Sequence, residues 1–115
     1  MGRKSVVKSF KMFQDQDIST NVSSEETSII NLDKASIRIS WTGTPVGEVQ
    51  VMVRNGEKEP WYELSMGAVV PIDGSESDHV LVFNELPFTD IRLDYVSTSG
   101  SGTMDATISA KVVGA

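Results

Sequence analysis

The chain has one histidine and no cysteine, so few of its residues could take part in catalysis. His79 follows Asp78 at the start of an apolar run, and an imidazole beside a carboxylate is part of what a Ser/His/Asp triad requires. Such catalysis needs several converging groups, yet the sequence has no Gly-x-Ser-x-Gly turn, no P-loop and no dinucleotide-binding motif. We therefore interpret His79 as a structural residue and predict that the protein is not an enzyme.

Three carboxylates, Asp73, Glu76 and Asp78, lie close together in the segment PIDGSESDH. Oxygen ligands of this type suit Ca²⁺, although their spacing is not that of an EF-hand loop. A solvated acidic loop explains the cluster equally well, and the absence of cysteine excludes thiolate metal sites. We predict no cofactor and no bound metal, with these three carboxylates as the alternative metal candidate.

Aromatic side chains on the surface of a β-sandwich could stack against sugar rings, as they do in carbohydrate-binding modules. Trp41 alternates with Ile37 and Ile39, so we predict that it lies in the core. Trp61 and Tyr62 are adjacent and must point to opposite faces of an extended strand. One of them is therefore exposed or at an interface, and both are kept as candidate ligand or interface residues.

The segments that must position these groups alternate between apolar and polar side chains, which is typical of half-buried β-strands. Residues 35–54 contain two such runs separated by Thr-Gly-Thr-Pro-Val-Gly at residues 42–47. Because Pro45 and the glycines interrupt both runs, we predict a β-hairpin here. The expected inward residues are Ala35, Ile37, Ile39 and Trp41 in the first run and Val49, Val51 and Val53 in the second.

The same alternation recurs at residues 90–96 and 103–112, and residues 79–83 are expected to form a strand buried on both faces. Asn55-Gly56 is a strong turn signal before the next strand at Trp61. Seven or eight strands at intervals of roughly 8–12 residues, with no helical pattern, predict an all-β, antiparallel, jelly-roll-like β-sandwich. We assign the sandwich core to residues 35–115, and an N-terminal arm with the first strands to residues 1–34.

The length of 115 residues suits one domain, and its net charge of −6 is unevenly distributed. Residues 1–13 carry four bases and no acid, which leaves six bases against 16 acids for the remainder. An acidic body repels nucleic acid and anionic membranes, so we expect neither as a partner. No apolar run approaches the ~20 residues that span a bilayer, and the N-terminus lacks the pattern of a secretory signal.

Basic and apolar residues are interleaved near the N-terminus, where we expect an extended arm or edge strand. The segment is too apolar to remain in water, so it should dock on its own domain or cross to a partner. A solvated, frayed terminus is the alternative. The candidate assembly residues are Arg3, Lys4, Val7, Lys8, Phe10, Lys11 and Phe13.

Several spaced motifs lie between residues 35 and 113: SWTGTPVG at 40–47, VQV at 49–51, RNG at 54–56, WY at 61–62, LPF at 86–88, IRLDY at 91–95, TSGSGT at 98–103 and ISAK at 108–111. Together they resemble a group of small proteins found among the structural genes of tailed bacteriophages. Residues 1–34 do not contribute to this resemblance.

The resemblance implies a non-enzymatic virion structural protein: a capsid decoration (cement) protein, or an accessory protein of the head, neck or tail. Such a protein would be assembled into the virion in the host cytoplasm through its N-terminal arm and sheet edges. The expected partners are other virion proteins and further copies of the chain in a homo-oligomer. The alternative is a carbohydrate-binding, host-adhesion module that uses Trp61 or Tyr62 to bind a glycan.

Overall fold

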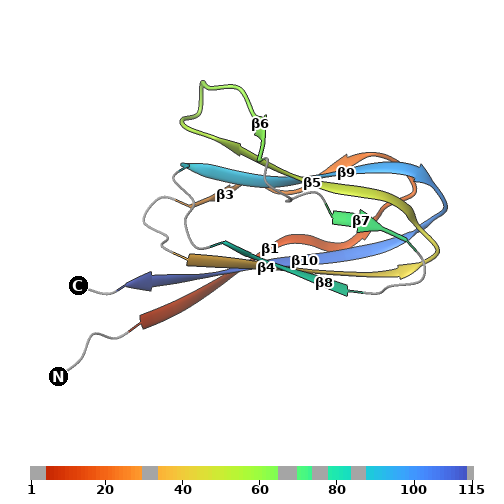
Figure 1. Cartoon of the computed structure of the whole chain (residues 1–115), viewed down its shortest axis with the longest axis horizontal. Helices are drawn as coiled ribbons and strands as arrows, with labels where there is room; N and C mark the ends of the chain where they lie inside the picture. The colour runs from red at the N-terminus through yellow and green to blue at the C-terminus, as the bar shows by residue number, and fades with distance from the viewer. Residues whose placement is uncertain (1–4, 30–33, 65–69, 74–77, 84–87, 114–115) are drawn as a thin grey trace.

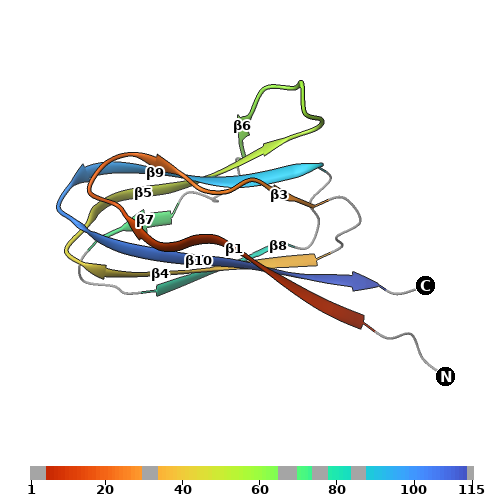
Figure 2. The same cartoon turned by 180° about the vertical axis from the view of Figure 1, so that it is seen from behind.

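The computed structural model describes residues 5–29, 34–64, 70–73, 78–83 and 88–113. These residues form two antiparallel sheets packed face to face, without a helix, which confirms the predicted all-β sandwich (Figures 1 and 2). The described ranges accordingly hold no helix long and apolar enough to cross a membrane. The strands are β1 (Ser5–Asp17), β2 (Val22–Ser23), β3 (Thr27–Ser28), β4 (Lys34–Gly43), β5 (Val46–Arg54), β6 (Tyr62–Glu63), β7 (Val70–Ile72), β8 (Asp78–Phe83), β9 (Asp90–Ser99) and β10 (Gly102–Val113).

The strand order is that of a jelly roll. One sheet has the order β1-β10-β4-β8, and the other has the order β2-β9-β5-β6, with β3 also on β9 and β7 also on β5. Because β2 and β3 share one edge of β9, and β6 and β7 share one edge of β5, the strands occupy eight positions. Numbered along the chain, these positions run 1-8-3-6 and 2-7-4-5, the order of a double Greek key. This arrangement agrees with the predicted seven or eight strands.

The predicted hairpin at residues 35–54 is wrong. The strands β4 and β5 lie in different sheets, and the chain crosses from one sheet to the other after Gly43, whose φ is +88°. Both strands are apolar on one side only, and turning the chain over places these two sides against each other across the core. β9 and β10 make the same crossing at Gly100, so the two arches pair strand for strand, β4 with β10 and β5 with β9.

The inward side chains are those that the alternation predicts. Ile37, Val51, Leu93 and Ile108 are all fully buried, and Trp41 lies in the same core. Burying one aliphatic side chain of this size contributes about 1.5–3 kcal/mol. The core therefore forms where strands from the two sheets present their apolar faces to each other.

The N-terminal residues 5–29 also contribute strands and core side chains to the sandwich. Met12 and Phe13 of β1 lie in the core, as do Ile18 and Ile29. Ser24 links β2 to β3 along β9: its N–H donates to the Leu93 carbonyl at 2.8 Å, and its hydroxyl accepts the Leu93 N–H at 2.8 Å. Residues 5–29 thus pack in the same body as the later strands.

The prediction that residues 79–83 are buried on both faces is wrong. Val80 and Val82 are 54% and 71% exposed, whereas His79, Leu81 and Phe83 are half-buried on the inward side. The reason is that β8 is an edge strand, and no element of the described ranges covers the outer face of its sheet (Figure 1). A run of apolar residues does not by itself reveal whether a second layer lies over it.

One buried hydroxyl lacks a hydrogen-bond partner among the described residues. Tyr95 is 1% exposed, and its hydroxyl is the one without a partner in the described part of the chain. The hydroxyl packs against Gly47: a Cβ added to this glycine would lie only 2.7 Å from the hydroxyl oxygen. Burial raises the pKa of Tyr95, and the Ser97 side chain, which opposes this shift, does not reach hydrogen-bonding geometry. The Tyr95 hydroxyl is therefore desolvated and has no hydrogen bond to a described residue.

We expect Tyr95→Phe to leave the free energy of unfolding unchanged or to raise it by about 1 kcal/mol, because it removes an unsatisfied buried group. The wild-type pKa is higher in the folded state than in the unfolded state, so this tyrosine destabilises the fold as pH rises above about 10. Urea denaturation at a series of pH values between 8 and 11 should show that the free energy of unfolding falls less with rising pH in Tyr95→Phe than in the wild type. Tyr62→Phe, at an exposed tyrosine, is the control, and an equal loss in both variants would contradict the prediction.

Candidate assembly surfaces

The candidate arm residues do not share one environment. Arg3 and Lys4 lie outside the described residues, and Val7 pairs with Lys111 in the ladder between β1 and β10. Phe13 is 2% exposed and packs in the chain's own core, so it is not on the surface.

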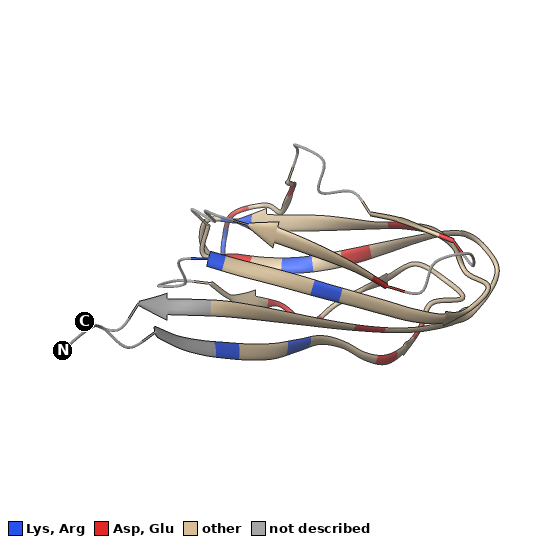
Figure 3. Cartoon of the chain, turned by 60° about the horizontal axis from the view of Figure 1, so that its bottom comes forward, with Lys and Arg blue, Asp and Glu red and all other residues tan. Residues whose placement is uncertain are grey.

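Lys8, Phe10 and Lys11 are exposed on β1, and Phe10 is 40% exposed. The N-terminal end of β1 and the C-terminal end of β10 extend beyond the other strands (Figure 1), and the two lysines of β1 follow within the sheet, where Lys8 pairs with Ala110 and Lys11 with Thr107 (Figure 3). A shallow groove lies beside this stretch, lined by Ser9, Phe10 and Lys11 and by residues 25–28. This end of the molecule therefore offers two cations and an aromatic ring to a neighbour.

The register of β1 shifts between Lys11 and Phe13 and again between Phe13 and Gln16. An extra residue at a bulge breaks the strict alternation of sides, so Met12 and Phe13 are both buried although they are adjacent. The adjacent pair of large apolar residues is the signal in the sequence that could have indicated this bulge.

Trp61 is held by two arginines on the outer face of the β9-containing sheet. The guanidinium carbons of Arg54 and Arg92 each lie 4.5 Å from the centre of its ring, which is a cation–π distance. The loop at residues 55–61 therefore folds back over β5 and β9. Tyr62 is 63% exposed, so only this ring remains free at the position where the sequence suggested a glycan contact.

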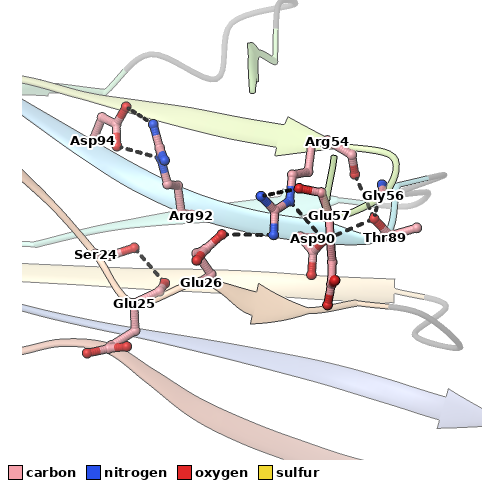
Figure 4. A network of polar contacts seen from close by, with 10 residues as sticks. All are labelled: Ser24, Glu25, Glu26, Arg54, Gly56, Glu57, Thr89, Asp90, Arg92 and Asp94. Atoms are coloured by element: carbon pink, nitrogen blue, oxygen red, sulfur yellow. Dashed lines mark hydrogen bonds and ion pairs between the residues drawn. The ribbon is translucent and has the colours of Figure 1, made fainter. Parts of the chain in front are cut away.

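Arg54 connects three parts of the chain (Figure 4). Its Nε donates to Asp90 Oδ2 at 3.1 Å, and its Nη2 lies 3.0 Å from Glu26 Oε1. The Thr89 hydroxyl accepts the Gly56 N–H at 2.7 Å beside this pair. These contacts join the segment before β3, the loop after β5 and the start of β9.

Arg92 makes a second ion pair on the same face. Its Nε and Nη2 lie 3.0 and 3.3 Å from the two carboxylate oxygens of Asp94 (Figure 4). This cluster could not be predicted from the sequence, because it depends on which residues become cross-strand neighbours. The only signal for the cluster in the sequence is that Arg54 and Arg92, both at outward positions, lie on either side of the Asn55-Gly56 turn and Trp61.

The acidic candidates for a metal site are only partly described. Asp73 is exposed, and its carbonyl accepts the indole N–H of Trp41 at 3.0 Å. Asp78 lies 4.0 Å from Arg38 in an exposed ion pair, and Glu76 lies outside the described residues. Within the described ranges no group of three histidine or acidic side chains could hold a metal ion. His79 points inward from β8, opposite Ile39 of β4.

Comparison with known proteins identifies the fold. No protein-family model matches the chain, and a search of the curated proteins finds no match. Among solved structures, the SPBc2 prophage-derived protein YomS superposes with a TM-score of 0.69 at 14% sequence identity, over 92% of this chain and 95% of that one. This chain is similar in fold to YomS.

Two further structures are more distant than YomS. A chain in the structure of infectious bursal disease virus Gx strain matches with a TM-score of 0.59 at 10% identity, over 97% of this chain and 33% of the viral one. This chain therefore corresponds to about a third of that viral protein. A mutant of a family 29 carbohydrate-binding module matches at 15% identity over 96% of this chain and 80% of that one. Its TM-score of 0.41 is too low to support a shared fold.

Proposed function

We propose that this protein is a non-enzymatic structural component of a bacteriophage virion. The observation that carries the proposal is the fold that it shares, over nearly the whole length of both chains, with the prophage-derived protein YomS. A fold alone does not specify a function. The spaced motifs that resemble tailed-phage structural proteins provide a second, independent reason.

Within the virion, we assign the protein to capsid decoration or to an accessory position at the head, neck or tail. Its partners are other virion proteins and further copies of itself, and it needs no cofactor. The exposed basic end of β1 and the sheet edges are the contact surfaces. Many identical weak contacts on a particle give a high combined affinity, so each individual contact can be small.

The test is whether the chain is part of purified particles of the phage that encodes it. Particles banded twice in a density gradient should contain the chain in a fixed ratio to the major capsid protein, measured by quantitative mass spectrometry. A phage-encoded replication protein is the control for carried-over lysate. A ratio near that of the capsid protein indicates decoration, a much lower fixed ratio indicates a neck or tail position, and absence from the particles would overturn the proposal.

The contribution of β1 is best tested with surface substitutions. Removing residues 1–20 would delete β1 together with Met12, Phe13 and Ile18 of the core, so a truncated chain could fail for lack of folding alone. The double variant Lys8→Glu and Lys11→Glu changes only exposed charges and should reduce incorporation while leaving thermal unfolding unchanged. Lys58→Glu, in the exposed turn after β5, is the matched control that should be incorporated normally.

A further inference from the structure

The sheet edges differ in how well they resist the addition of another strand. An edge strand presents unpaired backbone N–H and C=O groups, and proteins block such edges with bulges, lysines, prolines or very short strands. At the β1 edge there are two register shifts and the exposed Lys8 and Lys11. The edge formed by β2 and β3 and the edge formed by β6 and β7 consist of strands of two or three residues, and β7 contains Pro71.

The edge at β8 has none of these protections. Its six residues pair with β4 without a register shift, and they include neither lysine nor proline. No described residue pairs with the other side of β8. Its most exposed apolar side chains are Val80 and Val82, which are β-branched and suit a strand.

A second β8 strand fits this edge when it runs antiparallel. Residues directly opposite each other in an antiparallel pair lie on the same face, so inward residues must face inward residues. A two-fold axis through Leu81 satisfies this condition. It places Val80 opposite Val82 of the second copy on the outer face, and His79 opposite Phe83 of the second copy on the inner face.

The charge on the strand also favours this register. Asp78 is the only aspartate, glutamate, lysine or arginine among the six residues of β8. In this pairing the two copies of Asp78 are six residues apart along the paired strands, about 20 Å at the usual rise per residue. This distance is well beyond the screening length of about 8–10 Å in physiological salt. Moving the axis to Val80 would bring the two carboxylates closer and set each opposite a valine.

We propose that β8 pairs antiparallel with β8 of a second copy, with the two-fold axis through Leu81, so that two sandwiches share one continuous sheet. A closed, two-fold contact of this kind is the commonest form of self-association. The contact is short, so the isolated chain dimerises weakly and in a concentration-dependent manner. The biological purpose of the dimer rests on the proposed virion role. Its existence can be tested separately, on the isolated chain.

Sedimentation equilibrium of the full chain over a wide concentration range tests the dimer. The wild type should pass from monomer to dimer as concentration rises, and Val82→Lys should remain monomeric at every concentration. Val82→Thr keeps a β-branched residue and should still dimerise. Val46→Lys, at another exposed valine, should dimerise as the wild type does. Thermal unfolding of each variant checks that it is folded.

Engineered cysteines test the register, because the native chain has none. In the proposed pairing, residue 80 lies directly opposite residue 82 of the second copy, with Cβ atoms about 5 Å apart, whereas identical residues are diagonal neighbours at about 7–8 Å. A mixture of Val80→Cys and Val82→Cys should therefore form the mixed disulfide several-fold faster than either variant forms its own. Equal rates would overturn the register.

Three results would overturn the dimer itself: a monomer at all concentrations, a dimer that survives Val82→Lys, or growth beyond the dimer. The last of these would indicate head-to-tail pairing of β8 with the β1 edge of the next copy. A monomeric chain that is nevertheless present in purified particles would remove the dimer and leave the virion role intact. A chain that dimerises through β8 but is absent from purified particles would remove the virion role and leave the dimer intact.

Discussion

A Gly100→Ala variant is expected to lose about 3 kcal/mol or more of its free energy of unfolding, through backbone strain and a steric clash together. Gly100 has a φ of +77°, in a region that costs a residue with a Cβ roughly 1–2 kcal/mol. The new Cβ would also lie 2.1 Å from the Thr44 carbonyl oxygen and 3.2 Å from the Pro45 Cα. Both are backbone atoms of the neighbouring arch, so no side-chain rotation relieves the clash.

Gly56→Ala is the matched control for this prediction. Gly56 also has a positive φ, +117°, but a Cβ there would meet only Glu59 Cγ at 3.7 Å. It should therefore lose only the conformational part, about 1–2 kcal/mol. Urea denaturation followed by tryptophan fluorescence gives both values, because Trp41 is buried in the core. Equal losses of the free energy of unfolding in the two variants would contradict the prediction, because the clash with the neighbouring arch would then add nothing.

An Arg54→Ala variant is expected to lose about 3 kcal/mol, because it leaves the half-buried Asp90 carboxylate without its cation. The Arg54 and Asp90 side chains are only 15% and 18% exposed, so solvent screens this pair weakly. The substitution also removes one of the two cations beside Trp61 and the partner of Glu26. The loop at residues 55–61 should detach, with a rise in the solvent exposure of Trp61.

Two further variants separate the roles of charge and shape at this site. Arg54→Lys retains the positive charge but cannot contact Asp90 and Glu26 through separate nitrogens of a planar group, so it should give an intermediate loss. Arg38→Ala breaks an ion pair whose side chains are 71% and 60% exposed, and it should have almost no effect. Free energies of unfolding and acrylamide quenching of tryptophan fluorescence provide the measurements. A loss for Arg38→Ala as large as that for Arg54→Ala would contradict this account.

The inward face of each long strand could be predicted because a period of two is a local property. Ile37, Val51, Leu93 and Ile108 needed no knowledge of their neighbours to be assigned to the core. The pairing of strands could not be predicted in the same way, since a hairpin and an arch require the same alternation on both sides of a short glycine- and proline-containing turn. The position of Pro45 marks where the chain turns but not in which direction.

The surfaces were harder to predict than the core. The exposure of Val80 and Val82 follows from the position of β8 at the edge of a sheet, which depends on residues far away in the chain. The ring of Trp61 is covered because Arg54 and Arg92 lie on neighbouring strands. Phe13 was assigned to an arm because its neighbours are basic, whereas a bulge turns it into the core.

The pairing of β1 with β10 has a consequence for how the protein is made. The ribosome synthesises β1 before every other strand of the sandwich, yet β1 finds its partner only in β10, from Ser5 opposite Val113 onwards. Contacts between such distant segments make folding slow. During synthesis Met12 and Phe13 therefore remain without their native core contacts, and the sandwich closes only after β10 has been made.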